Sequence, residues 1–402
     1  MNLEIDDNEI DIGDKGDIPV EILNLLPDSR VTVLGLLQHL LPPVSHGFTL
    51  SSTVSFFDNS PPNVTDNEEI LTLPIPPATS IITLDKAFPD AVQNGYQSLK
   101  CLHVASTVGK TYPLWIIPLW KIISRLHVVQ HAWSTAQNTL LQYDRMWKEK
   151  GELDAVKVVE EVFNALRSLT WDDQLQGFSR NATDSIENLT VYASTNWLKG
   201  EHANQMLDLL KIDIEQAGLS TIEVAHTFFY AKISQGLDDV EKYTSHSSFR
   251  VYRHMGHMLA TGALDQLAFL ANLNQNHWGA VVLDFKNSII WYGDSLGGKI
   301  PSSMGENLKW WTKFHSSKDF TIKKLTITIQ KDFFSCCLLA WNALCVFLLP
   351  KTSHLIPAEG VAEARLKMLV RILHQHQARD DVRITYLLCF HLPNNFTAYR
   401  EP

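Results

Sequence analysis

A long amphipathic stretch is the clearest pattern in the first half of the chain. From Pro113 to about Lys150, apolar side chains recur every three to five residues, which places them on one face of an α-helix. The repeat consists of Leu114, Ile117, Ile122, Leu126, Val129, Trp133, Ala136, Leu140 and Tyr143. We therefore predict a long helix here and a second helix over roughly residues 153–169.

Before these helices, between residues 31 and about 110, the pattern changes. The short apolar runs VTVLGLL, ILTLPI and SIITL are separated by clusters of Pro and Asn, an arrangement typical of short strands and loops. A polar stretch over residues 172–188 marks the expected domain boundary. We therefore expect an amino-terminal domain over residues 31–180, with short strands and long helices and with no assigned function.

The start of the chain is acidic. Residues 1 to about 21 contain eight acidic residues and one lysine, Lys15. Mutual repulsion and a low apolar content favour a loose chain. We expect a disordered acidic tail over residues 1–30.

In the second half, two β-rich runs flank a polar centre in the segment NHWGAVVLDFKNSIIWYGDSLGG. They predict a hairpin with its turn near residues 284–287. A hairpin centred between residues 285 and 286 places His277 directly opposite Asp294 on one face. A carboxylate there can hold the imidazole in one tautomer, although such a pair is more often structural.

The segment TITIQKDFFSCCLLAWNALCVFLL supplies a candidate nucleophile. Its alternating apolar residues predict a strand through Ile329, residues 330–335 a loop, and the apolar run from Cys336 a buried helix. Ser335 is placed to cap this helix, which leaves Cys336 in the first turn, where the helix dipole favours a thiolate. Gln330, six residues earlier, could add an amide donor to an oxyanion hole.

Four motifs resemble those of the SUMO-specific, or ubiquitin-like-protein-specific, cysteine proteases of the sentrin-protease type (peptidase clan CE). They are Trp197-Leu198, His277-Trp278, Tyr292-Gly293-Asp294-Ser295-Leu296 and Gln330-x-Asp332-x-x-Ser335-Cys336. The resemblance covers residues 186–402. It implies an α+β, papain-like protease domain with a mixed, mainly antiparallel sheet flanked by helices, which follows a mostly helical amino-terminal domain.

The resemblance also implies an activity and its partners. Such proteases cleave after the carboxy-terminal Gly-Gly of a ubiquitin-like modifier, so the modifier and its conjugates would be the partners, with SUMO favoured. No metal and no organic cofactor would be required.

Carried over position by position, the resemblance assigns roles to single residues. Cys336 would be the nucleophile, His277 the general base and then acid, Asp294 the group that orients His277, and Gln330 part of the oxyanion hole. By the same mapping, Trp197 and Trp278 would flatten the tunnel for the modifier's tail, because only glycine fits between two indoles.

Two positions depart from the family's pattern. Cys337 stands where the family usually has Gly, and Lys199-Gly200 stands where it tends to have Asn-Asp. These departures leave open a catalytically inactive, modifier-binding or mobile-element-derived adaptor. An acyltransferase also stays open, because the same Cys-His-Asp geometry serves acetyl transfer in bacterial relatives of this fold. The stretch PLWIIPLWKIISRLHVVQHAW also resembles the region upstream of such domains in fungal, mobile-element-associated proteins.

Composition narrows the remaining possibilities. With 34 basic and 44 acidic residues the formal net charge is -10, and without a basic stripe we expect no direct binding of nucleic acid. The five cysteines are too few for a disulfide framework. The acidic start does not resemble a secretory signal, and no apolar run reaches the length of about 18 residues that spans a membrane. We expect an intracellular protein, nuclear or cytoplasmic and not secreted, with no membrane partner.

Overall fold

The computed structural model describes residues 18–45, 56–100, 110–179 and 184–390, with the side chains described up to residue 378. The chain forms two compact units. The first comprises Met1–Gln137 and Leu166–Asp173, and the second comprises Asn138–Ala165 and Gln174–Pro402.

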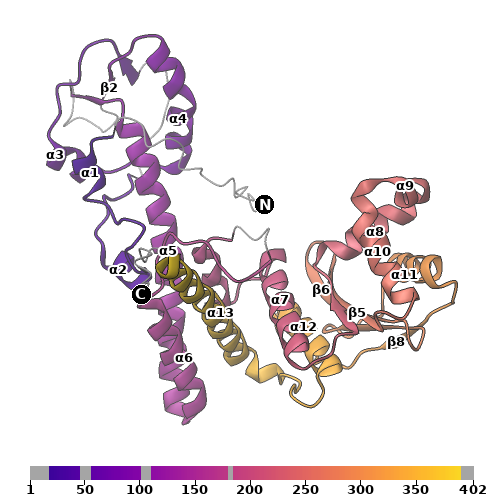
Figure 1. Cartoon of the computed structure of the whole chain (residues 1–402). Coiled ribbons are helices and arrows are strands. Elements are labelled where there is room, and N and C mark those ends of the chain that lie inside the picture. Colours follow the sequence, from indigo (N-terminus) through magenta and orange to yellow (C-terminus); the bar gives the residue numbers. More distant parts are fainter. Residues whose placement is uncertain (1–17, 46–55, 101–109, 180–183, 391–402) are drawn as a thin grey trace, which may run out of the picture. The chain divides into compact units, whose positions relative to one another are not determined.

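Helices predominate in the described part of the first unit (Figure 1). They are α1 (Val20–Leu23), α2 (Val33–Gln38), α3 (Asn67–Thr72), α4 (Ala78–Gln93) and the first part of α5 (Ile116–Lys150). The short strands β1 (Phe57–Asp58), β2 (Ser98–Lys100) and β3 (Thr111–Pro113) form an antiparallel sheet in that order. The long helix predicted from the apolar repeat is confirmed as α5, and the next one as α6 (Leu153–Leu166).

The strands predicted from the short apolar runs before residue 85 are wrong, because these runs lie in α2, α3 and α4. Local capping explains two of these helices: the Thr32 hydroxyl accepts a hydrogen bond from the Gly35 backbone N–H, and the Asp66 carboxylate accepts one from Glu68. In α4, Ile81 and Leu84 are three residues apart and both buried. That spacing fits one helix face, and a run of only five residues could not distinguish it from a strand.

Much of the predicted acidic tail, residues 1–17, lies outside the described residues. From Ile18 onward the chain is packed, since Ile18 and Ile22 are buried and α1 begins at Val20. Residues 18–30 are therefore not a loose tail.

The second unit is built on a five-stranded sheet in the order β4-β5-β6-β7-β8. Its strands are β4 (Ile222–Val224), β5 (Gln266–Leu273), β6 (His277–Asp284), β7 (Ile289–Asp294) and β8 (Thr321–Lys324). The central pairings β5–β6 and β6–β7 are antiparallel, and both edge pairings are parallel. The sheet is therefore mixed, with antiparallel pairing over its longest strands.

Helices cover both faces of this sheet. From residue 184 onward the helices of this unit are α7 (Gly200–Gln216), α8 (Phe228–Asp238), α9 (Val240–Ser245), α10 (Arg250–Ala260), α11 (Ser302–Ser316), α12 (Cys336–Leu348) and α13 (Val361–Phe390), with short 3-10 helices at Ile186–Ala193, Ser247–Phe249 and Ala358–Gly360. Helix α9 packs on α8, and α13 packs on α7 and on the 3-10 helix Ile186–Ala193. On one face, Phe269 of β5 contacts Phe229 of α8, whose ring also contacts Trp311 of α11. On the other, α12 packs on β5, β6 and β7 and is itself covered by α7 (Figure 1). Because β5 and β6 are covered on both faces, their sequences are almost continuously apolar. The α+β class expected from the sequence is confirmed.

The register of the β6–β7 hairpin differs from the prediction by two residues. Asp294 pairs with Gly279 and not with His277, and the ladder ends at Asp284 and Ile289. The reason is a four-residue turn over residues 285–288. In this turn the Asp284 carboxylate accepts hydrogen bonds from the backbone N–H and the side-chain amide of Asn287.

The strand expected over residues 325–329 is also absent, because β8 ends at Lys324. Beyond it, the Leu325 N–H still donates to Tyr292 O, and the Gln330 N–H donates to Ser295 O. Leu325 and Ile327 are buried while Ile329 is half exposed. The alternating apolar residues of this stretch therefore mark side chains that are buried against the protein, although the stretch is not a strand of the sheet.

Candidate active site

Cys336 is the first residue of α12, as predicted. The loop before it is shaped by Asp332, whose carboxylate accepts hydrogen bonds from the backbone N–H groups of Phe334 (2.9 Å) and Ser335 (2.8 Å). Ser335 occupies the N-cap position, but its hydroxyl donates to Asp332 and makes no cap hydrogen bond to the helix. The prediction that the Ser335 side chain caps α12 is therefore wrong.

The electrostatics of Cys336 also differ from the expectation. The residue is 5% exposed, and burial raises the pKa of its thiol, because a desolvated thiolate is disfavoured. Hydrogen bonding by the backbone of Trp278, Cys337 and Cys336 itself opposes this rise in pKa without cancelling it. The helix start therefore does not make this thiol acidic in the free protein.

His277 and Asp294 lie in contact despite the shifted register. His277 Nε2 and Asp294 Oδ1 are 2.7 Å apart, and Asp294 Oδ1 also accepts from the Leu296 N–H at 2.7 Å. Residues two positions out of direct register lie on the same face of a sheet, close enough for long side chains to meet. With Nε2–H donating to the carboxylate, Nδ1 of His277 carries the lone pair that can accept a proton.

A pocket of about 140 Å³ brings Cys336 together with the two predicted tunnel residues. Trp278 is 5% exposed and its indole N–H donates to Leu198 O at 3.0 Å, whereas Trp197 is 49% exposed. The full lining is Trp197, Leu198, Lys199, Gly200, Asn272, Gln275, Asn276, Trp278 and Cys336. His277, Asp294 and Gln330 lie outside this lining.

Gln330 is held by its neighbours in the loop. Its side-chain carbonyl accepts from the Ser295 hydroxyl at 2.6 Å, and its amide donates to Asp332 O at 3.0 Å. In the described structure this amide therefore fastens the loop before Cys336.

Sequence reasoning missed two features of this region, one in the pocket lining and one beneath the segment that leads into it. One is the turn between β5 and β6, where Asn274 and Gln275 have φ of 53° and 62°, a conformation that Asn tolerates better than most residues. This turn brings the amides of Gln275 and Asn276 into the lining. The sequence Asn274-Gln275-Asn276, directly before His277-Trp278, could have indicated this turn.

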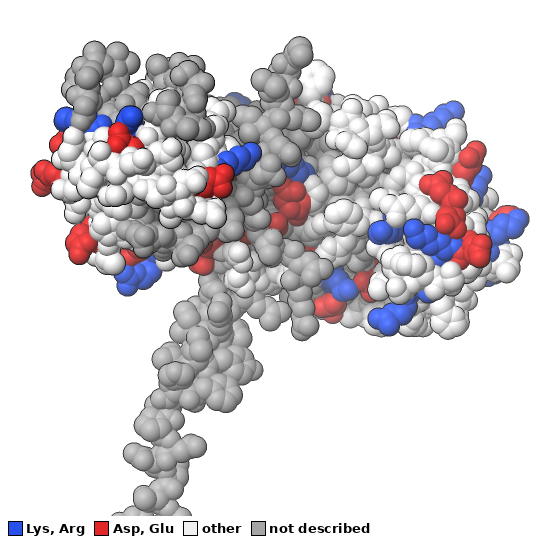
Figure 2. Space-filling model, turned by 90° about the horizontal axis from the view of Figure 1, so that it is seen from above, with Lys and Arg blue, Asp and Glu red and all other residues white. Residues whose placement is uncertain are grey.

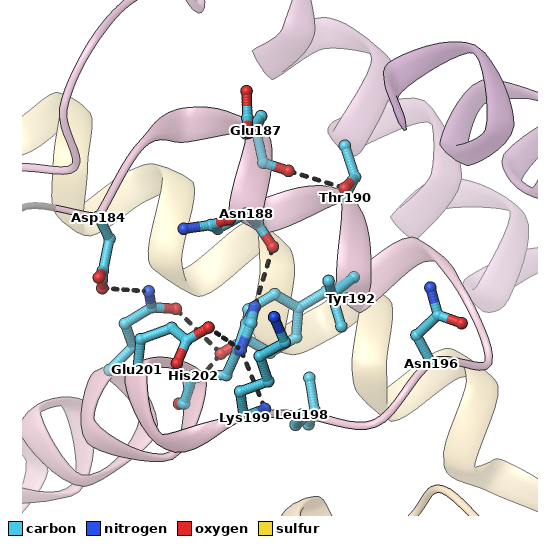
Figure 3. Close-up of polar contacts among 12 residues, drawn as sticks. Asp184, Glu187, Asn188, Thr190, Tyr192, Asn196, Leu198, Lys199, Glu201 and His202 are labelled. Carbon is cyan, nitrogen blue, oxygen red and sulfur yellow. Dashed lines mark hydrogen bonds and ion pairs between the residues drawn. The ribbon is translucent and has the colours of Figure 1, made fainter. Parts of the chain in front are cut away.

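The other missed residue is His202, which is buried in α7 beneath the segment that leads to Trp197 (Figure 3). His202 Nδ1 accepts from the Lys199 N–H at 3.2 Å, while Nε2 lies 2.9 Å from Asn188 O. Burial lowers the pKa of His202. His202 therefore occupies the N3 position of a capping box, whose side chain accepts a hydrogen bond from the backbone N–H of the N-cap residue, here Lys199. Its position three residues after Lys199 could have indicated this role.

Outside the pocket, three further properties bear on function: the distribution of surface charge, the presence of clusters that could bind a metal ion, and the presence of helices that could cross a membrane. On the face seen in Figure 2, acidic and basic side chains are interspersed. Among the residues that the structure describes, no group of three or more His, Cys, Asp and Glu side chains could hold a metal ion. In the same ranges, no helix has both the length and the apolar character needed to cross a membrane.

Comparisons with known proteins give a partial likeness. No family model matches the chain. The carboxy-terminal protease domain of yeast Ulp1, in complex with the SUMO orthologue Smt3, is 19% identical over 55% of this chain and 95% of that one, with a TM-score of 0.40. The catalytic domain of a Chaetomium thermophilum Ulp1-like SUMO protease is 13% identical over 54% of this chain and 89% of that one, with a TM-score of 0.41.

A bacterial protein is similar to a smaller part of the chain. The Xanthomonas campestris effector XopD, solved bound to ubiquitin, is 18% identical over 43% of this chain and 91% of that one, with a TM-score of 0.31. At these identities and scores, none of the three likenesses identifies an activity for this chain.

Proposed function

We propose that the second unit is a papain-like cysteine isopeptidase that cleaves after the carboxy-terminal Gly-Gly of a ubiquitin-like modifier, with SUMO as the favoured modifier. The observation that carries this proposal is the pocket in which Cys336 lies with Trp197 and Trp278. Two indoles beside a thiol leave room for a backbone without side chains, which is the character of a Gly-Gly tail. The amino-terminal half would make it a multidomain protein of the fungal, mobile-element-associated type.

The chemistry would follow the acyl-transfer scheme of a cysteine protease. His277 Nδ1 takes the proton of the Cys336 thiol, and the thiolate attacks the carbonyl carbon of the terminal glycine. The oxyanion is held by the Cys336 backbone N–H, with Gln330 beside it. The amine then leaves with the proton from His277, and a water molecule activated by His277 hydrolyses the thioester, while Asp294 stabilises the imidazolium.

A panel of modifiers tipped with a carboxy-terminal electrophile tests this function. We expect a covalent adduct with at least one modifier, lost in Cys336→Ala. Cys345→Ala is the matched control, because Cys345 lies buried in the same helix α12 and away from the pocket lining. Labelling that persists in Cys336→Ala would contradict the proposal.

A second function is favoured by two specific observations. Burial raises the pKa of Cys336, and in the described structure the hydrogen-bond partner of His277 is Asp294 and not Cys336. These features would also suit a relative that binds a modifier without cleaving it. Binding of a modifier to the native protein without adduct formation would select this alternative.

A further inference from the structure

Arg365 on α13 is an unusual buried charge. It is 1% exposed, and no carboxylate in the described ranges lies within ion-pair distance of it. Its guanidinium instead donates to three backbone carbonyls of one segment: Nη2 to Val191 O (2.5 Å) and Asn196 O (2.9 Å), and Nε to Tyr192 O (3.4 Å). This segment, residues 191–196, leads directly into Trp197 and Leu198 of the pocket.

The same guanidinium contacts the loop that carries the thiol. Its central carbon lies 5.5 Å from the ring centre of Phe334, a distance at which a cation is attracted to an aromatic face. Phe334 precedes Ser335 and Cys336, and its backbone N–H is bound by Asp332. One side chain therefore touches two segments, far apart in sequence, that both end at the pocket.

A purely space-filling role does not explain an arginine here. Burying a guanidinium without a carboxylate is costly, and well-packed apolar residues usually fill such a site more favourably. Burial lowers the pKa of Arg365 to about 10, so the group is still charged at neutral pH. Its Nη1 atom is buried without a hydrogen-bond partner in the described part of the chain. What the charge provides is a set of donors that bind three carbonyls at once.

Other contacts fasten the two ends of the segment but do not reach the Cys336 loop. His202 binds Asn188 O and the Lys199 N–H, and the Tyr192 hydroxyl lies within hydrogen-bond distance of His202 O and of the Gln205 side chain (Figure 3). These partners lie in the 3-10 helix Ile186–Ala193, at Lys199 directly before α7, or in α7 itself. Among these contacts, Arg365 is the one that joins the segment to the loop at Phe334.

We propose that Arg365 is a positioning residue that holds the segment 191–196, which leads into Trp197, against the loop of residues 331–335, which leads into Cys336. In this way Arg365 sets the geometry of the pocket between Trp197, Trp278 and Cys336. Its effect on catalysis rests on the proposed function, whereas its effect on the two segments does not. The two parts are therefore tested by separate measurements.

The kinetic test compares Arg365→Met with Arg371→Met in the full-length protein. Arg371 lies on the same helix, ion-paired with Asp213 (2.8 Å) and away from the pocket. For a modifier with a reporter amide at its Gly-Gly end, we expect kcat/KM to fall roughly 100-fold in Arg365→Met, as for a misplaced reacting group, and to stay unchanged in Arg371→Met. Alkylation of Cys336 by iodoacetamide should change less than about threefold, because a small reagent needs no aligned tail.

Arg365→Lys and Phe334→Leu keep the test decisive if the methionine variant does not fold. The lysine variant retains the charge but cannot bridge three carbonyls, and the leucine variant removes the ring. We expect kcat/KM to be intermediate in both variants, with KM raised more than kcat is lowered. The proposal would be overturned if kcat/KM of Arg365→Met equalled that of the wild type, or if kcat/KM of both Arg365→Lys and Phe334→Leu did.

Hydrogen exchange tests the positioning itself, independently of activity. We expect faster amide exchange in peptides covering residues 191–198 and 331–336 in the Arg365 variants, unchanged exchange in β5 and β6, and no change in Arg371→Met. Unchanged exchange in both peptides would overturn the role of Arg365 even in an active protease. A wild-type protein that fails to react with any modifier would instead overturn the proposed function and leave the exchange result to decide the role of Arg365.

Discussion

The state of the Cys336 thiol depends on two opposing effects at one residue. The start of α12 and nearby backbone groups favour the thiolate, while burial favours the neutral thiol and raises the pKa. Burial is the larger effect, so the resting protein holds a neutral thiol. Proton transfer to His277 would then follow substrate binding, which excludes water and completes the site.

A pH series of iodoacetamide alkylation checks this balance. Because the pKa of Cys336 is raised above its usual value of 9.0, the thiolate fraction should still be increasing at pH 9. We expect the rate of Cys336 alkylation, measured by peptide mass spectrometry with Cys336→Ala as the blank, to rise throughout the series. A rate that levels off near pH 7 would instead reveal an acidic thiol.

How far single residues could be predicted depended on how local their environment is. A predicted helix start indicated Cys336 and a predicted hairpin indicated the pair His277–Asp294, with the family motifs agreeing; the pair lies in contact at 2.7 Å although the predicted register was off by two residues. Arg365 could not be found in this way, because its partners lie about 170 residues earlier in the chain and no local pattern marks a buried arginine. The direction of the Cys336 pKa shift was missed because the burial of this residue depends on the tertiary structure and not on the local sequence.

At the scale of secondary structure, long periodic patterns were reliable and short ones were not. Helix α5 was recognisable from nine apolar positions, whereas a run such as SIITL fits a strand or a helix equally well. Hairpin register depended on the turn, and a four-residue turn moved His277 by two positions relative to Asp294. The contact between His277 and Asp294 tolerates this shift, because a displacement of two keeps a side chain on the same face.

The packing of α10 on α11 gives a prediction at this scale. A Cβ at Gly256 of α10 would overlap the ring of His315 of α11, whereas a Cβ at Gly305 would meet the end of Ile322 at 3.4 Å and a methyl group of Ile300 at 3.8 Å, without overlap. We expect Gly256→Ala to lower the free energy of unfolding by roughly 2 kcal/mol, the usual cost of overpacking. Urea denaturation measures it.

Gly305→Ala is the matched control, since it gains the same helix propensity without the overlap. We expect it to leave the unfolding midpoint unchanged or slightly raised. Equal midpoints for the two variants would mean that α10 and α11 are not packed as closely as described here.

For the whole molecule, the division into units sets which parts of the chain belong with the site. All six residues predicted for catalysis and tail binding lie in the second unit, which also includes Asn138–Ala165. A sequence boundary near residue 180 could not show this, because the inclusion of α6 and the end of α5 depends on packing between distant segments and not on composition.

One partly buried histidine, His315, makes the stability of the folded protein sensitive to acid. Burial lowers the pKa of His315 to about 4, with a smaller contribution from His257, and His315 Nε2 lies within hydrogen-bond distance of the Tyr243 hydroxyl, at 2.8 Å. The unfolded chain therefore binds this proton first, at its usual pKa of 6.5. Stability from this residue is complete above pH 6.5 and is lost as the pH falls towards 4.

Denaturation midpoints between pH 7 and pH 4 measure this loss. We expect the His315 contribution to be roughly 2 kcal/mol, allowing for partial exposure. His315→Gln keeps an acceptor for Tyr243 but cannot titrate, so its stability should depend less on pH than that of the wild type. Parallel pH profiles for the two proteins would exclude His315 as the sensitive group.

The placement of two neighbouring thiols at the start of α12 affects how the protein must be handled. Consecutive side chains on a helix point about 100° apart, so Cys336 and Cys337 cannot close a ring without unwinding the first turn. Cys345, the other thiol among the described cysteines, lies nine residues further along the same helix. Cys336 is therefore not protected by a disulfide with Cys337, and its resistance to peroxide during storage rests instead on its burial and on its raised pKa, which keep the thiolate fraction low at neutral pH.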